Sequence, residues 1–492
     1  MRLKNASQLK SVGLKDLRRD ILDIAEHGLA AADPYNNTLK TVRIIDGHFL
    51  HIGCPEFNVK GAPYEEEVTY DLNTQIDRVY VFGAGKGIQR IAEALETVFG
   101  DRLAGGMLIL KYGDTTELKK IKVEYGAHPV PDEGCIYSSR KLVAMIQDAH
   151  FTERDLVFVI IGNGTSSLLT LPPDELSLEA VQQVTKVMQI EEGMTTPQVN
   201  LVRNQIDILK GGRITRLFGK SKQIHLVPID LEEPNALGGV GFNGYMDTNF
   251  WIHSLPDCTS CERALDFIKE KGLEKKLPEE ILVYLKAHIG NNTVLTKQEY
   301  LNLGCRVYGL MPHSSSFIPK LKERCLELGY EPHCMTKRTF VEAKEAGQLF
   351  SRIAVNIALE NEPFKKPCAL IITGELKVTV DKSNGVGGRN QEFALSSADI
   401  ISGYNIAVFA VDTDGTDGPG GEFSSFATDL GCTNLAGGLV DGKTKALSLE
   451  RGVDLPMVLS NHDTSAALWT LDSGVWMSHS ISVQDLIIFL IH

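Results

Sequence analysis

The chain lacks any long hydrophobic segment. None of its uninterrupted apolar runs approaches the ~20 residues that span a bilayer as a helix. The first twenty residues, MRLKNASQLKSVGLKDLRRD, are rich in charge where a signal peptide would carry an apolar core. These absences argue against membrane insertion and secretion, and they predict a cytoplasmic protein.

An excess of basic residues is also missing. The 492 residues include 50 Lys+Arg and 63 Asp+Glu, for a net charge of −13. Overall attraction to nucleic acids or acidic membranes is therefore disfavoured, and neither is predicted as a partner. A small anionic substrate is not excluded, because local arginines and lysines can reverse the field inside a cleft.

The cysteines provide neither a disulfide framework nor a zinc site. There are 9 of them, an odd number scattered along the chain, as expected for reduced thiols in the cytosol. Cys258 and Cys261 have C-x-x-C spacing. A structural zinc site would need a second such pair or suitably spaced histidines, and neither accompanies this pair.

The patterns that are present predict an α/β protein of two domains, since a single core rarely exceeds roughly 250–300 residues. An amphipathic pattern predicts a helix over 14–32, and 41–51 is expected to be strand. In the first half, short β-branched runs lead into glycine turns and helical patterns, which predicts a parallel sheet with helices on both faces. The expected strands there are 78–82, 107–110, 155–161 and 223–229.

A charged helical stretch, 262–290, separates these strands from a second group. The boundary is therefore placed near 290–300, with domains at 1–295 and 296–492. The second group of expected strands is 305–310, 368–373, 377–380 and 406–410.

Two glycine-rich loops follow predicted strands and indicate anion binding. A loop between a strand and a helix exposes backbone N–H groups and the positive end of the helix dipole, and glycine allows close approach. The loop 83–87, GAGKG, adds Lys86, which would neutralise a phosphoryl group. The loop 162–167, GNGTSS, adds hydroxyls, although Thr165 or Ser166 would serve equally as a helix cap.

Neither loop carries a common nucleotide-binding signature. The Walker A spacing is absent, and the third position of a G-x-G-x-x-G motif counted from Gly83 and Gly85 holds Ile88. The strand–glycine–helix pattern alone would also suit an NAD-linked oxidoreductase. The missing third glycine argues against that alternative.

Charged residues form three further candidate groups. Arg203 and Lys210 lie two helical turns apart, as either a solvated basic face or a ligand site. Arg389 and two amides follow glycine-rich backbone at 385–388. The segment 412–419, DTDGTDGP, holds three carboxylates that repel one another unless a cation, an arginine or solvent relieves them. Its spacing is not that of an EF-hand, and a surface turn is the alternative.

Six strings in fixed order give the chain a specific resemblance. They are GAGK at 83–86, GAHPVPDEG at 126–134, VRNQIDILKGGR at 202–213, EAKEAG at 342–347, GVGGRNQEFAL at 385–395 and DTDGTDGP at 412–419. Over nearly its whole length the chain resembles the glycerate 2-kinases, whose second half is called the MOFRL domain; some relatives have carried a hydroxypyruvate reductase label. The resemblance implies an N-terminal Rossmann-like parallel sheet with flanking helices and a C-terminal α/β MOFRL domain. ATP, Mg²⁺ and D-glycerate are expected in a cleft between them.

The resemblance also implies an activity: ATP-dependent transfer of the γ-phosphoryl group to the 2-hydroxyl of D-glycerate or a related small hydroxy acid. Such chemistry depends on positioning and charge neutralisation. Lys86 and Arg389 match the family's essential lysine and arginine, and they would clamp phosphoryl oxygens and the carboxylate. Asp230 matches a family aspartate, and Asp414 and Asp417 match its acidic loop. Which of these binds Mg²⁺ and which accepts the hydroxyl proton stays open.

Lys86, Arg389 and Asp230 are thus the predicted catalytic residues, and Asp414 and Asp417 the predicted metal ligands. A homodimer is left open. The residues predicted to bind nucleotide or substrate are Gly83, Gly85, Gly162, Asn163, Gly164, Thr165, Ser166, Arg203, Lys210, Glu375, Gly388, Asn390 and Asp414.

Several ligand loops depart from the family pattern. Asn163 stands where the family has the middle glycine of Ser-Gly-Gly-Gly-Ser, and Leu376 replaces the threonine of Gly-Glu-Thr. The loop 473–480 reads SGVWMSHS in place of Thr-Gly-Pro-Thr-Gly-Thr-Asn-Val. These changes keep an alternative open: a noncatalytic or substrate-switched relative that binds a small anion or a protein partner.

Overall fold

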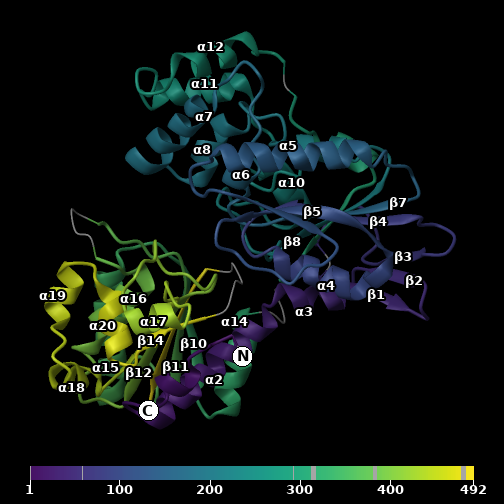
Figure 1. The fold of residues 1–492 in the computed structure, drawn as a ribbon. Coiled ribbons are helices and arrows are strands. Elements are labelled where there is room, and N and C mark those ends of the chain that lie inside the picture. The colour runs from purple at the N-terminus through teal and green to yellow at the C-terminus, as the bar shows by residue number, and fades with distance from the viewer. Residues whose placement is uncertain (1, 58, 292, 312–316, 381–384, 478–483) are drawn as a thin grey trace. The chain divides into compact units, whose positions relative to one another are not determined.

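A computed structural model describes residues 2–57, 59–291, 293–311, 317–380, 385–477 and 484–492 (Figure 1). Its contacts divide the chain into two compact units. The central unit is Pro34–His313, and the terminal unit combines Met1–Asp33 with Ser314–His492. None of the described helices has the length and apolarity needed to cross a bilayer.

The central unit is built on a six-stranded sheet in the order β6-β5-β4-β7-β8-β9. Every neighbouring pair is parallel, which confirms the predicted Rossmann-like sheet. The strands are β4 (Arg78–Ala84), β5 (Leu103–Lys111), β6 (Lys122–Gly126), β7 (Asp155–Ile161), β8 (Lys222–Val227) and β9 (Arg306–Gly309).

Helices cover both faces of this sheet, because its strands are apolar on both sides. Along β7, Leu156, Phe158 and Ile160 pack into one core, and Val157 and Val159 pack into the other. The first core also contains residues of α4 (Gln89–Phe99), and the second contains residues of α5 (Glu133–Asp148). The remaining helices close to the sheet are α3 (Pro34–Thr41), α6 (Thr165–Leu168), α9 (Arg213–Leu217), α10 (Gly241–Thr248), α13 (Lys297–Asn302) and the short 3-10 turns η1 (Pro55–Phe57) and η2 (Gly100–Arg102).

Two smaller parts complete the central unit. The segment expected as one strand at 41–51 forms a hairpin instead, with Asp46 and Gly47 at positive φ in its turn. The resulting antiparallel sheet contains β1 (Val42–Ile45), β2 (Phe49–Ile52) and β3 (Val68–Asp71). Figure 1 shows a helical group that contains α7 (Leu178–Thr185), α8 (Thr196–Arg203), α11 (Cys261–Glu270) and α12 (Glu279–Ala287). Together with η3 (Lys186–Glu191), these helices bury a hydrophobic core of their own.

The terminal unit has a mixed six-stranded sheet in the order β10-β11-β15-β12-β13-β14. Its last strand, β15, pairs antiparallel with both β11 and β12, so the C-terminal segment occupies the middle of the sheet. The α/β class predicted for this half is confirmed, although β15 was not foreseen. The strands are β10 (Glu331–Thr339), β11 (Cys368–Gly374), β12 (Ile406–Asp412), β13 (Gly437–Asp441), β14 (Gly474–Val475) and β15 (Asp485–Ile491).

Helices from distant parts of the sequence pack on this sheet. The N-terminal helix α2 (Lys15–Ala31) contacts α14 (Phe317–Glu327) and strands β12 and β15. Helices α15 (Ala343–Glu360) and α16 (Arg389–Ala398) pack on each other and share a core with alternate residues of the central strands. The remaining helices are α1 (Ala6–Leu9), α17 (Ser425–Asp429), α18 (Thr444–Glu450), α19 (Leu455–Ser460) and α20 (Thr464–Thr470).

The two observed units differ from the predicted domains, 1–295 and 296–492, in two places: at the N-terminus and at the boundary between the domains. The N-terminal 33 residues belong to the terminal unit, where Arg18 is fully buried and paired with Asp441. Arg18 also donates to the Leu9 carbonyl at 3.0 Å and to Ser473 Oγ at 3.1 Å. At the other boundary, β9 pairs with β8 and completes the central sheet. An apolar pattern shows that a segment is buried, but not against which sheet.

The buried Arg18 predicts a stability effect. Arg18→Ala should lower the free energy of unfolding of the terminal unit by about 3–5 kcal/mol, because it leaves Asp441 charged and buried without its partner. Denaturant unfolding followed by tryptophan fluorescence in a Trp251→Phe background measures it, since Trp469 and Trp476 both lie in the terminal unit.

The control is Arg19→Ala, whose side chain is 61% exposed and pairs with exposed Asp16. Its effect on the free energy of unfolding should be much smaller than that of Arg18→Ala, because solvent screens an exposed ion pair. Equal losses for the two variants would contradict a special role for the buried pair.

Candidate functional site

The two glycine loops lie at the switch point of the central sheet. Strands β4 and β7 are neighbours, but the chain proceeds from β4 to β5 on one side and from β7 to β8 on the other. In open α/β sheets, ligands bind beyond the carboxyl ends of the strands at such a point. Gly83–Gly87 and Gly162–Ser166 occupy that position.

The backbones of the two loops touch each other. The Lys86 N–H donates to the Asn163 carbonyl at 2.7 Å, and the Gly162 N–H donates to the Ala84 carbonyl at 3.0 Å. Gly85 has φ +139°, and a Cβ added there would lie 2.6 Å from the Gly162 Cα. Glycine is therefore required at position 85 for the two loops to come into contact. This contact between the loops fixes the position of the Lys86 backbone.

The departure at Asn163 leaves this backbone intact. Asn163 has no positive φ, whereas Gly164 has φ +79°. At Gly162, an added Cβ would lie 2.5 Å from Ile88 Cγ2. The two flanking glycines thus meet the steric demands of the loop, and the middle position tolerates a side chain.

Polar side chains gather around the second loop. The Thr165 hydroxyl donates to the Ala84 carbonyl at 2.6 Å, a structural role in joining the loops. A Cβ at Gly164 would lie 3.0 Å from the His128 ring and 3.4 Å from Lys86 Cγ, so both side chains border this glycine. Ser166 Oγ lies 2.9 Å from His253 Nε2.

Arg203 and Lys210 are both buried, which excludes a solvated basic face. Lys210 donates to Asp207 at 2.5 Å and to Thr170 Oγ1 at 3.0 Å. Arg203 donates to Gln189 Oε1 at 2.7 Å, while its Nε has no hydrogen-bond partner among the described residues. Burial lowers the pKa of Arg203 to about 10. Within the described part of the chain no carboxylate pairs with Arg203, so this cluster carries a buried positive charge that an anion would relieve.

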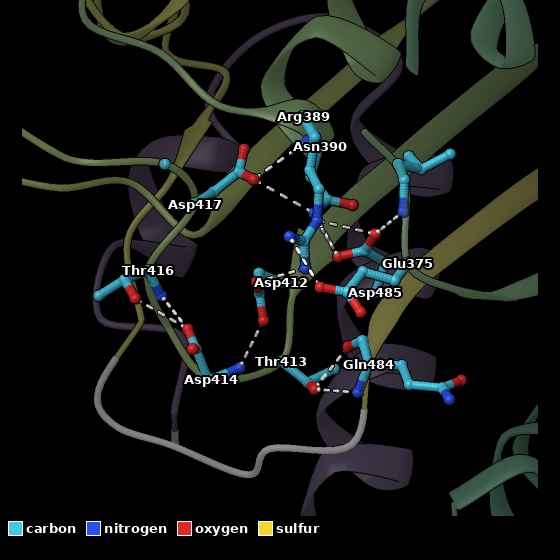
Figure 2. Close-up of polar contacts among 12 residues, drawn as sticks. Glu375, Arg389, Asn390, Asp412, Thr413, Asp414, Thr416, Asp417, Gln484 and Asp485 are labelled. Atoms are coloured by element: carbon cyan, nitrogen blue, oxygen red, sulfur yellow. Dashed lines mark hydrogen bonds and ion pairs between the residues drawn. The ribbon is translucent and has the colours of Figure 1, made fainter. Parts of the chain in front are cut away.

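A second cluster surrounds Arg389 in the terminal unit (Figure 2). Arg389 Nε donates to Asp485 at 2.9 Å, and one terminal nitrogen donates to Asp412 at 2.8 Å. Glu375 lies 3.5 Å from the other terminal nitrogen. Burial acts to lower the pKa of Arg389, but attraction to Asp485 and Asp412 outweighs it and raises this pKa. The starts of α16 and β15 and the carboxyl ends of β11 and β12 converge here.

Asp417 anchors the start of α16. Its two carboxylate oxygens accept the backbone N–H groups of Asn390, at 3.2 Å, and Gln391, at 2.9 Å. Gly388 permits the close approach, since a Cβ there would lie 2.4 Å from the Asp417 carboxyl carbon. Burial raises the pKa of Asp417 to about 7, although these N–H donors and Arg389 act to lower it. Burial also raises the pKa of Asp412 and of Asp485.

Asp414 lies in the loop that follows β12. Its Oδ1 accepts the Thr416 backbone N–H at 2.9 Å and the Thr416 hydroxyl at 2.8 Å. Among the described residues, no group of three or more His, Cys, Asp or Glu side chains is arranged to hold a metal ion. The assignment of Asp414 and Asp417 as metal ligands therefore stays a prediction.

Two further predicted features, Asp230 and the loop 473–480, lie outside the clusters described above. Asp230 lies in the turn after β8 and accepts the Glu232 N–H at 2.9 Å within that turn. Of the loop 473–480, residues 478–480 lie outside the described residues. Trp476, the most conspicuous departure there, donates its backbone N–H to Asn5 Oδ1 at 3.0 Å and lies 4.7 Å from the Lys4 amine. The N-terminal segment thus contacts this indole.

Sequence reasoning missed three polar residues of these clusters: Asn200, His253 and Asp485. It placed Asp412 in the acidic segment 412–419 but not among the predicted site residues. Asp412 and Asp485 stand at the ends of apolar strand runs, a signal that could have placed them at a sheet edge. Asn200 and His253 carry no motif, and only the fold brings them to Ser166.

Comparison with known proteins supplies the family. A domain of unknown function, DUF4147, matches residues 20–238, and the MOFRL family matches residues 368–481. The glycerate 2-kinase of Pyrococcus horikoshii is 31% identical over 454 residues, which cover 92% of each chain. The D-glycerate 2-kinase of Thermotoga maritima is 30% identical and covers 85% of this chain and 91% of its own. The chain belongs to the glycerate 2-kinase family.

Solved structures agree with this assignment to the glycerate 2-kinase family. The crystal structure of glycerate kinase (EC 2.7.1.31) from T. maritima has a TM-score of 0.72 at 26% identity, covering 97% of this chain and 100% of that one. A P. horikoshii crystal structure has a TM-score of 0.68 at 28% identity, covering 96% and 98%. The predicted resemblance is confirmed, and with it the enzyme class: phosphotransferases with an alcohol group as acceptor.

The raised pKa of Asp417 predicts a pH effect on stability. The native state holds this proton up to about pH 7, whereas an unfolded aspartate releases it near pH ~3.9. Stability should therefore decrease as pH rises between these two values, by up to roughly 1.4 kcal/mol per pH unit. Asp417→Asn, which cannot ionise, should flatten this decrease in denaturant unfolding measured from pH 4.5 to 8.

Asp429→Asn makes the same charge change on an exposed residue of α17 and should leave the slope unchanged. If Asp417→Asn shows the wild-type slope, Asp417 ionises normally in the folded protein.

Proposed function

We propose that the chain is an ATP-dependent kinase that transfers the γ-phosphoryl group to the 2-hydroxyl of D-glycerate or a related small hydroxy acid. The observation that carries this proposal is the position of Lys86 within the first of two glycine loops, which are in backbone contact at the switch point of the central sheet. The names of the relatives support the choice of acceptor.

The loop geometry suits a transferring phosphoryl group. Phosphoryl transfer needs donors and cations placed before the reaction, because the charge spreads over the phosphoryl oxygens. Lys86 would supply one such cation. Arg203, which is buried and has no carboxylate partner among the described residues, would add positive potential, and its burial strengthens its field. The charge of Lys210 is balanced by Asp207. Gly85 and Gly162 allow the two loops to pack against each other, and this contact fixes the backbone that carries Lys86.

Arg389 would supply a second cation. Its contacts with Asp485, Asp412 and Glu375 hold the guanidinium in one orientation and keep it charged. They engage three of its five N–H donors. Glu375 is the most exposed partner, with 68% of its side chain accessible, so a ligand anion would displace it more readily than the buried Asp485.

ATP is used with a divalent cation, and the acidic loop fits one. Mg²⁺ is usually held by one or two carboxylates together with substrate phosphates, so a cluster of three ligands is not required. Asp414 would supply such a carboxylate; Asp417 is less suited, since both its oxygens accept helix N–H groups. The ion would neutralise phosphate charge.

Asp230 is the residue proposed to accept the hydroxyl proton. It follows β8, the neighbour of β7, and therefore lies at the same carboxyl edge of the sheet as the glycine loops. A carboxylate there can act as a general base once a substrate hydroxyl comes within hydrogen-bond reach.

Lys86→Ala tests the proposal. With ATP and D-glycerate, the wild type should form ADP and 2-phosphoglycerate, resolved from the 3-phospho isomer by ³¹P NMR. The variant should lose at least ~10²-fold in kcat/KM, the usual scale for a group that stabilises transition-state charge.

Lys119→Ala, on an exposed lysine of the same unit, is the control and should keep full activity. Absence of transfer from ATP to D-glycerate and to other small hydroxy acids by the wild type would refute the kinase proposal. The noncatalytic alternative would then stand.

A further inference from the structure

Ser166 is held by two side chains that come from distant parts of the chain. Its Oγ lies 2.9 Å from His253 Nε2 and 2.9 Å from Asn200 Nδ2. His253 and Asn200 are fully buried, whereas Ser166 is partly exposed. The hydroxyl is therefore held by two buried side chains, in a residue that keeps some exposure to solvent.

The orientation of Asn200 is determined by a backbone carbonyl. Asn200 Nδ2 also lies 2.9 Å from the Phe250 carbonyl oxygen, which can only accept a hydrogen bond. The NH₂ end of the amide must therefore face Phe250 and Ser166, and Asn200 donates to Ser166 Oγ. One lone pair of the hydroxyl is occupied in this way.

The surroundings of His253 keep its ring neutral. Burial, together with the charges of Lys210, Arg203 and Arg213, lowers the pKa of His253 well below its ordinary value. A neutral imidazole has one N–H and one acceptor nitrogen. In the contact with Ser166, Nε2 therefore either donates its N–H to the hydroxyl or accepts the hydroxyl proton.

We propose that His253 is a positioning residue whose Nε2–H donates to Ser166 Oγ, so that Ser166 directs its own proton to an anionic oxygen of the ligand. With Asn200 as the second donor, both lone pairs of the hydroxyl are occupied. The remaining hydrogen bond of Ser166 is then the one that its own O–H donates, and this bond is available to a ligand. The proposal rests on the glycine loops being the ligand site of the proposed kinase.

The charges around the loop support an anion in preference to a neutral group. Lys86 and His128 border Gly164, two residues before Ser166. Arg203 is buried without a carboxylate partner in the described part of the chain. A cationic field attracts an anion, and an anion oxygen needs donors. A serine locked as a donor meets that need, whereas a serine that gave its proton to His253 would not.

Calorimetric titration of the full-length protein with tripolyphosphate and, separately, with D-glycerate tests the proposal without requiring turnover. Ser166→Ala and His253→Ala should each weaken binding of one of these anions by about 10-fold or more, the scale of a hydrogen bond to a charged group. The ligand affected identifies whether a phosphate or the carboxylate meets Ser166. His253→Gln, whose amide can donate from the same place, should remain within about threefold of wild type. His48→Gln, in the β1–β2 turn, is the control.

A double variant separates positioning from a general structural role. If His253 acts through Ser166, Ser166→Ala/His253→Ala should bind no more weakly than Ser166→Ala alone. Additive losses, or unchanged affinity for both anions in the single variants, would overturn the proposal. If His253→Ala does not fold, Ser166→Ala and His253→Gln still decide. Loss of kinase activity without any change in anion affinity would count against His253 as a positioning residue while leaving the proposed function in place.

The tautomer provides an independent readout. In ¹⁵N-histidine-labelled protein, the His253 ring should show a protonated Nε2 and an unprotonated Nδ1, with its signals identified by their absence from His253→Gln. A protonated Nδ1 with an unprotonated Nε2 would contradict the proposal, because Ser166 would then donate to the ring.

Discussion

The backbone contact between two glycine loops is the constraint on which the central unit's site depends. Gly85 and Gly162 approach so closely that a Cβ on either would collide with its surroundings. This contact places Lys86 and Ser166 at the switch point of the sheet, where β4 and β7 lie side by side. Side chains in the loops can vary, as Asn163 does, provided that these glycines remain.

The cluster around Ser166 and the cluster around Arg389 each carry an unbalanced charge, positive in the first and negative in the second. Around Ser166, the buried Arg203 has no carboxylate partner in the described residues, so the central unit keeps a positive charge suited to an anion. Around Arg389, three carboxylates face one guanidinium, and burial raises the pKa of Asp412 and Asp485. Buried groups of unequal charge are costly in a folded protein unless a ligand completes them. This arrangement is expected of a site that binds charged reactants.

Prediction from sequence succeeded where a pattern is local. The strand–glycine–helix alternation identified β4, β7 and the parallel sheet, because each unit of that pattern is contiguous in the chain. It did not place β15, whose pairing with β11 and β12 is purely tertiary. It also assigned the N-terminal helix to the first domain, whereas Arg18 and Asp441 join it to the terminal unit.

The sequence by itself determined the family, the α/β class and the loops that hold Lys86 and Arg389, since these are written in short ordered strings of residues. Only the tertiary structure decided which side chains surround them. His253 and Asn200 reach Ser166 from positions 87 and 34 residues away, and Asp485 reaches Arg389 across 96. Such contacts form where helices, loops and strand termini from distant parts of the chain meet, and no local pattern records which distant segment will lie there.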